Sequence, residues 1–452
     1  MFGSDKKRSP STAQAGREAR RAIKNRKKRG RIGNDAFVSN PLESVVKSEP
    51  PKVTVPSGSF IKSTDIIRVK GSPDMIMLVT IIILTMLGLI MDFSASYAYA
   101  NTAYGDSLYY IRKQFIFAVV GIVVMLAMVF FRWFNDYTLY KKFTLPVYVV
   151  SIILLVLVLA VGLAKGDAQR WINVPGTSFT IQPSEIGKLA IVMMMALYVS
   201  QRQDDIIDYE NKAKSFRSGI ILPGVIIGIP IGLVFLESHY SCVIIMGLIG
   251  ISLMFVAGSD RKVLLIGMGA AVFLLFVFIL FKGGYALNRI DMWLFPEKQD
   301  PTGTIWQTLQ GLYAIGSGGL FGVGLGNSKQ KYLFVSQPQN DFVFSIVCEE
   351  LGFAGATLVI VLFILLMWRG YRTAMRAPDT YSSLLAFGIT FKLTVQTALN
   401  IAVVTNTIPN TGISLPFFSY GGTALLMQLG EMGILLIISK YTYREVRPRS
   451  DT

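Results

Sequence analysis

Ten long apolar runs dominate the chain beyond residue 74 and restrict it to one class of fold. Each is close to the roughly 20 residues that an α-helix needs to cross the hydrocarbon core of a bilayer. The chain has 452 residues, of which 52% are hydrophobic and 16% are charged, and this balance does not suit a soluble globular protein. We therefore predict an all-α polytopic membrane protein with ten transmembrane helices. The runs lie near residues 75–97, 114–131, 143–163, 184–200, 219–236, 240–257, 263–281, 342–367, 384–404 and 417–439.

Basic residues flank these runs unevenly, and the asymmetry predicts an orientation. Alternate loops contain RWFNDYTLYKK, SDRK and RGYRTAMR, whereas the loop from Thr405 to Pro416 has no charged residue. Cytoplasmic loops of membrane proteins carry an excess of Lys and Arg. With ten spans, we expect both termini in the cytoplasm of a multi-pass protein of the cytoplasmic (inner) membrane. The large loop between helices 7 and 8, residues 282–341, is then extracytoplasmic.

The N-terminal tail holds much of the net charge of +16. Residues 1–73 contain 17 Lys and Arg residues against 6 Asp and Glu residues, a net charge of +11. Such a tail could lie on the membrane surface, dock on anionic lipid headgroups or bind RNA. We expect a disordered cytoplasmic tail that helps to set the topology, with membrane lipids rather than nucleic acid as partners. The predicted organisation is a basic tail over 1–73, a ten-helix membrane domain over 74–441 and a short cytoplasmic tail over 442–452.

Polar side chains recur at helical spacing inside the predicted spans, where each ionisable group is expensive and tends to mark function. The fourth span opens with QPSEIGK, in which Glu185 and Lys188 lie one turn apart. Individually, such residues often only fix helix packing through interhelical hydrogen bonds and ion pairs. Together they predict a polar cavity that opens toward the outer face. Two further sets share the i, i+4, i+8 spacing, namely Lys392, Gln396 and Asn400 in the ninth span and Asp341, Ser345 and Glu349 in the eighth.

The last span begins SLPFFSYGGTALLMQLGEMG, and its composition leaves two interpretations open. Pro416 suits the first turn of a helix, and Glu431 would be buried deep in the span. Gly421 and Gly422 permit a close backbone approach, either for helix packing or for a ligand. The glycine-rich stretch GSGGLFGVGLGNS has neither a preceding strand nor a following P-loop lysine, so we do not expect nucleotide binding.

Cysteine and histidine usage argues against a metal site of the zinc type. The chain has two cysteines, Cys242 and Cys348, both in apolar runs and expected to be small buried hydrophobes. It has one histidine, His239, which is too few for a His-ligated zinc site.

Four motifs in order resemble the SEDS family (shape, elongation, division and sporulation), closer to its FtsW branch than to RodA. The resemblance covers about residues 73–442 and implies a ten-helix peptidoglycan glycosyltransferase. Such an enzyme polymerises lipid II, a disaccharide peptide on undecaprenyl pyrophosphate, outside the cytoplasmic membrane for cell division. The implied partners are a class B penicillin-binding protein, which is a transpeptidase, and other divisome proteins. The motifs are QRWINVPGTSFTIQPSEIGKLA, DPTGTIWQ, GLYAIGSGGLFGVGLGNSKQKYLFVSQPQNDFVFSIVCEELGFAG and IPNTGISLPFFSYGGTALL.

The resemblance also implies roles for individual residues. The family's essential aspartate in the large outer loop corresponds to Asp300, which we expect to be catalytic. Two departures stand out: His239 occupies the place of an aspartate often found between spans five and six, and Cys348 that of a glycine before EELG. The residues that match family positions lining the outer cavity, and that we expect to bind substrate, are Arg170, Glu185, Lys188, Lys392, Ser419, Gly421, Gly422 and Thr423.

The reaction that the resemblance implies needs few groups. Transfer with inversion of an anomeric carbon from a lipid pyrophosphate needs a base for the incoming hydroxyl and positive charge for the departing pyrophosphate. Asp300 would supply the base, taking the proton as the new bond forms. Arg170, Lys188 and Lys392 are candidates for the pyrophosphate, and a divalent cation such as Mg²⁺ or Mn²⁺ could assist.

Three classes of function differ in their expected results. A glycosyltransferase makes glycan polymer from lipid II, whereas a flippase moves lipid II across a membrane without polymer, and a scaffold only recruits partners. Charged residues in an outward cavity favour the first. Elongation or sporulation, rather than division, remains an alternative setting for the same polymerase.

Overall fold

The structure is a computed structural model that describes residues 70–131, 133–165, 168–173, 180–208, 210–270, 291, 293–295 and 305–442. The basic tail up to residue 69, Asp300, most of the seventh predicted span and residues 443–452 lie outside the described residues.

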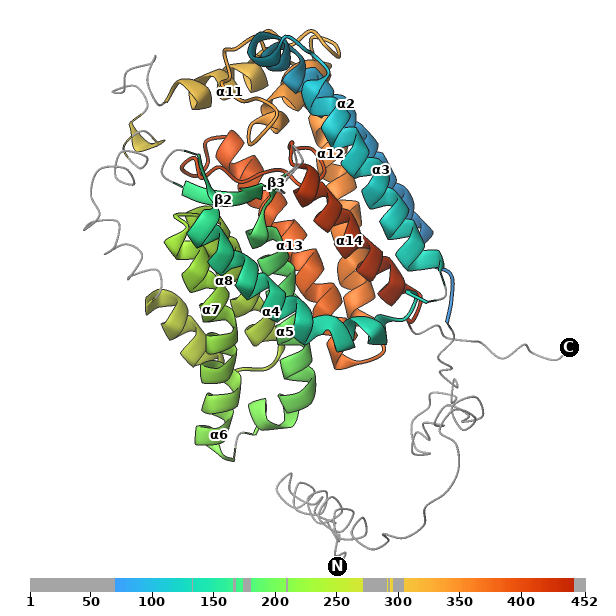
Figure 1. The fold of residues 1–452 in the computed structure, drawn as a ribbon, viewed down its shortest axis with the longest axis vertical. Coiled ribbons are helices and arrows are strands. Elements are labelled where there is room, and N and C mark those ends of the chain that lie inside the picture. Colours follow the sequence, from blue (N-terminus) through green and yellow to red (C-terminus); the bar gives the residue numbers. More distant parts are fainter. Residues whose placement is uncertain are drawn as a thin grey trace, which may run out of the picture. The chain divides into compact units, whose positions relative to one another are not determined.

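Long α-helices make up most of the described chain (Figure 1). A three-stranded antiparallel sheet in the order β1-β2-β3 lies between α4 and α5 in sequence. The helices are α2 (Met75–Tyr104), α3 (Tyr109–Phe130), α4 (Tyr137–Val161), α5 (Pro183–Ile206), α6 (Lys212–Phe216), the π-helical turn η1 (Arg217–Ile221), α7 (Leu222–Leu236), α8 (Tyr240–Val256), α11 (Trp306–Ser317), α12 (Val343–Met375), α13 (Thr380–Val404) and α14 (Gly422–Ser439), and the strands are β1 (Leu163–Lys165), β2 (Ala168–Asn173) and β3 (Thr180–Ile181).

The prediction of a helical, multi-pass membrane protein is confirmed. Eight helices of the described chain are long and apolar enough to cross a membrane, with α6, η1 and α7 running on as one of them. The sixth predicted span corresponds to α8, which is a shorter apolar helix of 17 residues. Residues 261–270 are helical where the seventh predicted span begins. The number of ten helices stays a prediction.

Two local features differ from the prediction. The last helix begins at Gly422 rather than near residue 417, because Phe417 adopts a left-handed backbone (φ 66°) that interrupts helical geometry. The purely α-helical expectation also missed the small sheet. Its register pairs Leu163 with Trp171 and Ile172 with Ile181, and tryptophan and isoleucine are residues that favour strands.

Helix α13 lies at the centre of the bundle and packs against α5, α8 and α12. Its approach to α5 depends on Gly388, where an added Cβ would lie 2.5 Å from Val192 Cγ1 and 3.1 Å from Val192 Cγ2. Small residues let membrane helices approach closely, and the resulting van der Waals contact stabilises them without a hydrophobic driving force. The close contact fixes the position of Lys392 and Gln396, one and two turns further along the same helix.

Replacing Gly388 by alanine should therefore destabilise the bundle. We expect Gly388→Ala to cost about 1–3 kcal/mol, because the methyl group overlaps both γ-carbons of Val192. The measurement is thermal unfolding of the detergent-solubilised protein. Gly228→Ala on α7 is the matched control, since its added Cβ would meet nothing within 4 Å. Equal melting temperatures for the two variants would contradict the packing argument.

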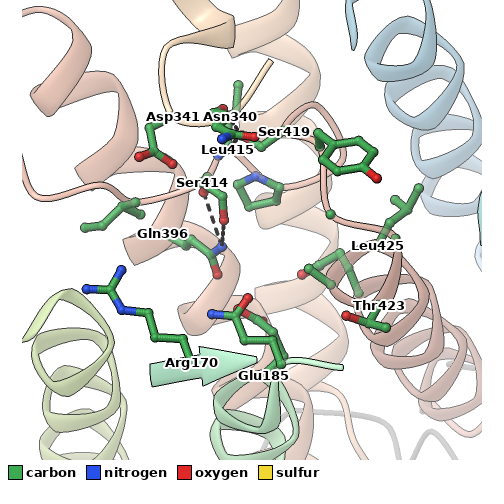
Figure 2. A pocket seen from close by; sticks show the side chains of 18 of the residues that line it. Arg170, Glu185, Asn340, Asp341, Gln396, Ser414, Leu415, Ser419, Thr423 and Leu425 are labelled. Carbon is green, nitrogen blue, oxygen red and sulfur yellow. Dashed lines mark hydrogen bonds between the residues drawn. The ribbon is translucent and has the colours of Figure 1, made fainter. Parts of the chain in front are cut away.

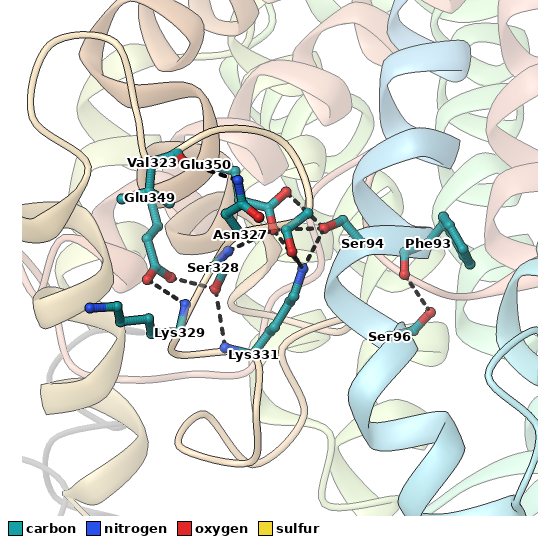
Figure 3. Close-up of polar contacts among 11 residues, drawn as sticks. Phe93, Ser94, Ser96, Val323, Asn327, Ser328, Lys329, Lys331, Glu349 and Glu350 are labelled. Carbon is teal, nitrogen blue, oxygen red and sulfur yellow. Dashed lines mark hydrogen bonds and ion pairs between the residues drawn. The ribbon is translucent and has the colours of Figure 1, made fainter.

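The segment from Gly318 to Asp341 folds back against α12 and is held by two adjacent buried glutamates (Figure 3). Glu350 accepts hydrogen bonds from Ser94 Oγ (2.7 Å) and Lys331 Nζ (3.0 Å). Glu349 accepts from the backbone N–H of Lys329 (2.8 Å) and from Ser328 Oγ (2.5 Å). These bonds satisfy charges that would otherwise be costly to bury, and they fix the chain that leads to Asp341.

Candidate active site

A cavity of about 520 Å³ lies among α3, β2, α5, the α7–α8 turn and the segment that precedes α14. Figure 2 shows Arg170 and Glu185 on one side, Asn340, Asp341 and Ser419 on the other, and Gln396 and Ser414 between them. The amide of Gln396 donates to the carbonyl of Ser414 (3.2 Å) and so ties α13 to the non-helical wall. Irregular backbone at membrane depth is tolerated where it lines such a cavity.

Hydrogen bonds from other elements hold the segment SYGG at the entrance to α14. Ser419 Oγ donates to the carbonyl of Asn340 (2.7 Å) and accepts from the N–H of Leu415 (2.7 Å). Gln114 of α3 donates to the carbonyl of Ser419 (3.3 Å) and accepts from the N–H of Gly421 (3.1 Å). The four contacts leave this wall little freedom, so its backbone is presented to the cavity in one arrangement.

The close approach of α14 to α3 settles what Gly422 does in the fold. A Cβ at this position would lie 2.0 Å from the ring of Phe117. Gly422 is therefore required for helix packing, and it also lines the cavity. The packing interpretation of this glycine is supported by the contact with Phe117, and ligand binding at Gly422 stays a prediction.

Four buried charges, of which Glu185 and Lys188 line the cavity, form a chain of alternating sign. Lys188 Nζ lies 2.7 Å from Glu185 Oε1, and Lys392 Nζ lies 2.7 Å from Glu431 Oε1. Lys392 Nζ also lies 3.8 Å from Glu185 Oε2, which joins the two pairs. Each side chain is less than a tenth exposed. Such mutual pairing is what makes ionised groups tolerable away from water.

Three cationic side chains line the cavity, namely Lys113, Arg170 and Lys188. Two carboxylates, Glu185 and Asp341, line it as well. Three cations against two carboxylates leave the lining with a net charge of +1. A pocket of this charge attracts an anion such as a phosphate.

The turn between α7 and α8 forms another part of the wall. Burial raises the pKa of Glu237 to about 8, and Arg170 opposes this shift. Burial, with the positive charges of Arg170 and Lys188, lowers the pKa of His239 to about 3. The imidazole is therefore neutral at pH 7, and Arg170 donates to the carbonyl of Ser238 (3.1 Å) between these two residues.

The structure brings together most of the residues predicted to bind substrate. Lys392 is the exception, because it lies one layer behind the lining and pairs with Glu431. Any effect of Lys392 on substrate would act through Glu185. The predicted residues that line the cavity are Arg170, Glu185, Lys188, Ser419, Gly421, Gly422 and Thr423.

The sequence analysis missed Lys113 and the pairing of Lys392 with Glu431. Lys113 stands in the charged stretch RKQ at the start of the second span, a signal that could have identified it. The pairing of residues 39 apart in sequence has no such signal.

The described part of the chain contains no group of three His, Cys, Asp or Glu side chains placed to hold a metal ion. Its two cavity carboxylates, Glu185 and Asp341, do not by themselves form such a set. Assistance by Mg²⁺ or Mn²⁺ stays a prediction, and no step below depends on it.

The sequence profile FTSW_RODA_SPOVE, described as "Cell cycle protein", matches residues 74–444. Stage V sporulation protein E of Bacillus subtilis (strain 168) is 38% identical over 375 residues, covering 82% of this chain and 98% of that protein. The probable peptidoglycan glycosyltransferase FtsW of Trichlorobacter lovleyi is 39% identical over 369 residues, covering 81% and 93%.

Two solved structures share the fold. One is a chain from work described as "Structural coordination of polymerization and crosslinking by a peptidoglycan synthase complex", with 24% identity, a TM-score of 0.65 and coverage of 81% of this chain and 97% of that one. The other is the rod shape determining protein RodA of Thermus thermophilus, with 23% identity, a TM-score of 0.58 and coverage of 82% and 98%.

Proposed function

The chain belongs to the family of FtsW, RodA and SpoVE cell cycle proteins, and we propose on that basis that it is a peptidoglycan glycosyltransferase. The enzyme polymerises lipid II into glycan strands, with division as its setting. Several relatives, including the FtsW proteins of Trichlorobacter lovleyi and Bacillus subtilis, are named probable peptidoglycan glycosyltransferases. The observation that carries the proposal is the cavity, in which Lys113, Arg170 and Lys188 supply the positive charge that a pyrophosphate requires.

The experiment is polymerisation of purified lipid II by the protein reconstituted in vesicles, with the products resolved by length. Glycan polymer is the expected product. Transport of lipid II across the vesicle membrane without any polymer would instead identify a flippase. Partner recruitment with neither activity would identify a scaffold.

In the proposed mechanism, one residue activates the acceptor hydroxyl and others bind the leaving pyrophosphate. Asp300 accepts the proton of the incoming sugar hydroxyl as the glycosidic bond forms. Arg170 and Lys188 hold the pyrophosphate of the donor and neutralise the charge that grows on it as it departs. Glu185 orients the ammonium of Lys188 at 2.7 Å, and Lys392 holds Glu185 from behind. Ser419, Gly421, Gly422 and Thr423 form the facing wall.

The proposal includes the number of spans and their orientation in the membrane. Ten helices span the cytoplasmic membrane, both termini are cytoplasmic, and the loop between helices 7 and 8 that carries Asp300 is extracytoplasmic. A basic tail over residues 1–73 and a short tail over 442–452 flank the membrane domain over 74–441. The distribution of Lys and Arg supports this orientation.

Cysteine labelling tests the orientation. Gln299→Cys, next to Asp300, should react with a membrane-impermeant maleimide added to intact cells, whereas Ser4→Cys in the tail should react only after permeabilisation. Cys242 and Cys348 are buried, so their background is low. Protection of residue 299 in intact cells would show that the loop faces the cytoplasm.

A class B penicillin-binding protein is the proposed partner, together with other divisome proteins. A structure that shares this fold comes from a peptidoglycan synthase complex in which polymerisation and crosslinking are coordinated. Crosslinking is the chemistry of a transpeptidase. A polymerase that works on the outer face of the cytoplasmic membrane would deliver its glycan strand directly to such a transpeptidase.

A further inference from the structure

Residues 319–326, the apolar loop, belong to the glycine-rich stretch that follows α11. Phe321 is 83% exposed and Leu320 is 67% exposed, and Val323 and Leu325 are exposed as well. No charged residue occurs in the sequence from residue 301 to residue 328. Single exposed apolar residues are ordinary on a protein, but a contiguous apolar patch marks an interaction surface.

The apolar loop is bonded to a break in α12. At Gly352 the backbone leaves helical geometry (φ 69°, ψ −170°), so the carbonyls just before it lose their partners within the helix. The carbonyl of Glu349 accepts instead from the N–H of Val323 (3.0 Å). The carbonyl of Glu350 accepts from the N–H of Gly324 (3.1 Å). The loop thus supplies the donors that the broken helix lacks.

The other side of the break is satisfied in the same way. The N–H of Phe353 donates to the carbonyl of Gly319 (2.9 Å), and the N–H of Ala354 donates to the carbonyl of Leu320 (3.0 Å). Non-helical backbone is tolerated at membrane depth only where its polar groups find partners within the protein. The apolar loop and the break in α12 meet this condition for each other.

The depth of the apolar loop follows from its connection to α2. Ser94 lies within the apolar run over residues 75–97 and donates to the carboxylate of Glu350 at 2.7 Å (Figure 3). Beyond Ser94, α2 continues to Tyr104, a further rise of roughly 15 Å. The part of α12 that binds the loop therefore lies beside the apolar part of a helix that is long enough to cross the membrane.

The apolar loop also adjoins an exposed side of α12. Val361, Ile364 and Trp368 are each more than half exposed, and their spacing places them on one side of the helix. Phe353, which is 67% exposed, begins this side, and its N–H is bonded to the loop. Because α12 is a candidate membrane span, an exposed apolar side of it faces lipid. The loop continues that lipid-facing side at the end where α12 breaks.

We propose that the apolar loop inserts into one leaflet of the bilayer, with Leu320 and Phe321 in contact with the lipid acyl chains. In the proposed orientation this is the outer leaflet. Three observations favour lipid as the occupant of this surface, namely the absence of charge, the depth set by Ser94 and the continuity with the lipid-facing side of α12.

Insertion has a consequence that rests on the proposed function. Helix α11 begins at Trp306, shortly after Asp300, and it packs against α12. An inserted loop at the end of α11 would hold this helix at the membrane surface, where a lipid-linked sugar lies. The insertion itself does not depend on glycosyl transfer.

Fluorescence quenching tests the insertion. Phe321→Cys, labelled with an NBD maleimide, places a probe on the loop, and the fold tolerates the change because Phe321 is largely exposed. Cys242 and Cys348 are buried, so background labelling is low. The full chain is placed in nanodiscs of phosphatidylglycerol and phosphatidylethanolamine, with one protein in each. A nitroxide near the start of the acyl chain should lower the emission roughly twofold or more, since interfacial segments reach about 5–10 Å into the bilayer.

A probe on α2 provides the control. Asn101 is exposed and lies beyond the apolar run of its helix, so Asn101→Cys should be quenched by iodide in the water and not by the lipid nitroxide. Iodide quenching at residue 321 as strong as at residue 101 would place the loop in water and overturn the proposal. Protection of residue 321 from both quenchers would show that protein, rather than lipid, covers the loop, and it would overturn the proposal equally.

Charged substitutions add an independent measurement with the probe moved to Leu325→Cys. Leu320→Glu with Phe321→Glu should reduce quenching by the lipid nitroxide roughly twofold or more, because carboxylates are costly among acyl chains. Leu320→Met with Phe321→Leu is the matched control and should keep the quenching. Equal quenching in the two double variants would contradict insertion. Polymer formation is not measured, so a protein that inserts the loop but makes no polymer would refute only the proposed function.

Discussion

Asp300→Asn should lower the rate of lipid II polymerisation by roughly 10² or more. Asparagine keeps the size of the side chain and most of its hydrogen bonding, but it cannot accept the proton of an attacking hydroxyl. Binding of lipid II and of the transpeptidase should persist, because neither depends on a base. The measurement is the initial rate of polymer formation at saturating lipid II, with binding of lipid II assayed separately.

A matched variant in the same loop controls for charge. Asp291 is exposed and lies nine positions before Asp300, so Asp291→Asn removes an equal charge without removing the proposed base. We expect it to retain near wild-type activity. Asp300→Glu keeps the carboxylate and should retain part of the rate. If Asp300→Asn polymerises at the rate of Asp291→Asn, the base lies elsewhere in the cavity.

Lys392→Met should cost about 3–5 kcal/mol of stability, a large part of what a domain of ordinary stability possesses. Methionine fills similar space but removes the only charge that pairs with Glu431 in the described structure, where Glu431 is 0% exposed. Glu185 loses a second positive neighbour in the same step. The measurements are the yield of folded protein in membranes and its melting temperature in detergent.

The double variant Lys392→Met with Glu431→Leu tests whether the loss of stability comes from the unpaired charge. It removes both charges, so no uncompensated carboxylate stays buried between α13 and α14. Replacing a whole buried pair by apolar residues is often neutral. We therefore expect the double variant to regain most of the stability lost in the single one. Equal destabilisation in both would mean that shape, rather than charge, governs this contact.

The helices were predictable from sequence because each carries its own signal. An apolar run of membrane length predicts a helix whatever its neighbours do, and the turn at Ser238 between α7 and α8 was visible as a short polar break. The start of α14 was not predictable in this way. Phe417 takes up a left-handed conformation two residues before Ser419, which Asn340 and Gln114 hold by hydrogen bonds, and both of these partners are distant in sequence.

The candidate site was likewise predictable from sequence only in part. Glu185 and Lys188 could be paired from their spacing on one helix, and their contact at 2.7 Å agrees with it. The spacing of Lys392, Gln396 and Asn400 predicted one polar face but not its partners. Lys392 turns to Glu431, and Gln396 turns to Ser414, because the packing of α13 against α14 and the cavity wall decides which polar group each one meets.

The alternating chain of Lys188, Glu185, Lys392 and Glu431 has a consequence for how the protein experiences the membrane voltage. A voltage acts on net charge, at about 2.3 kcal/mol per elementary charge per 100 mV. Two ammonium groups and two carboxylates sum to zero, so the electric field exerts no net force on this cluster. A displacement of the four groups as one unit along the field therefore costs no electrical work, whereas loss of any one of the four charges would leave a cluster on which the voltage acts.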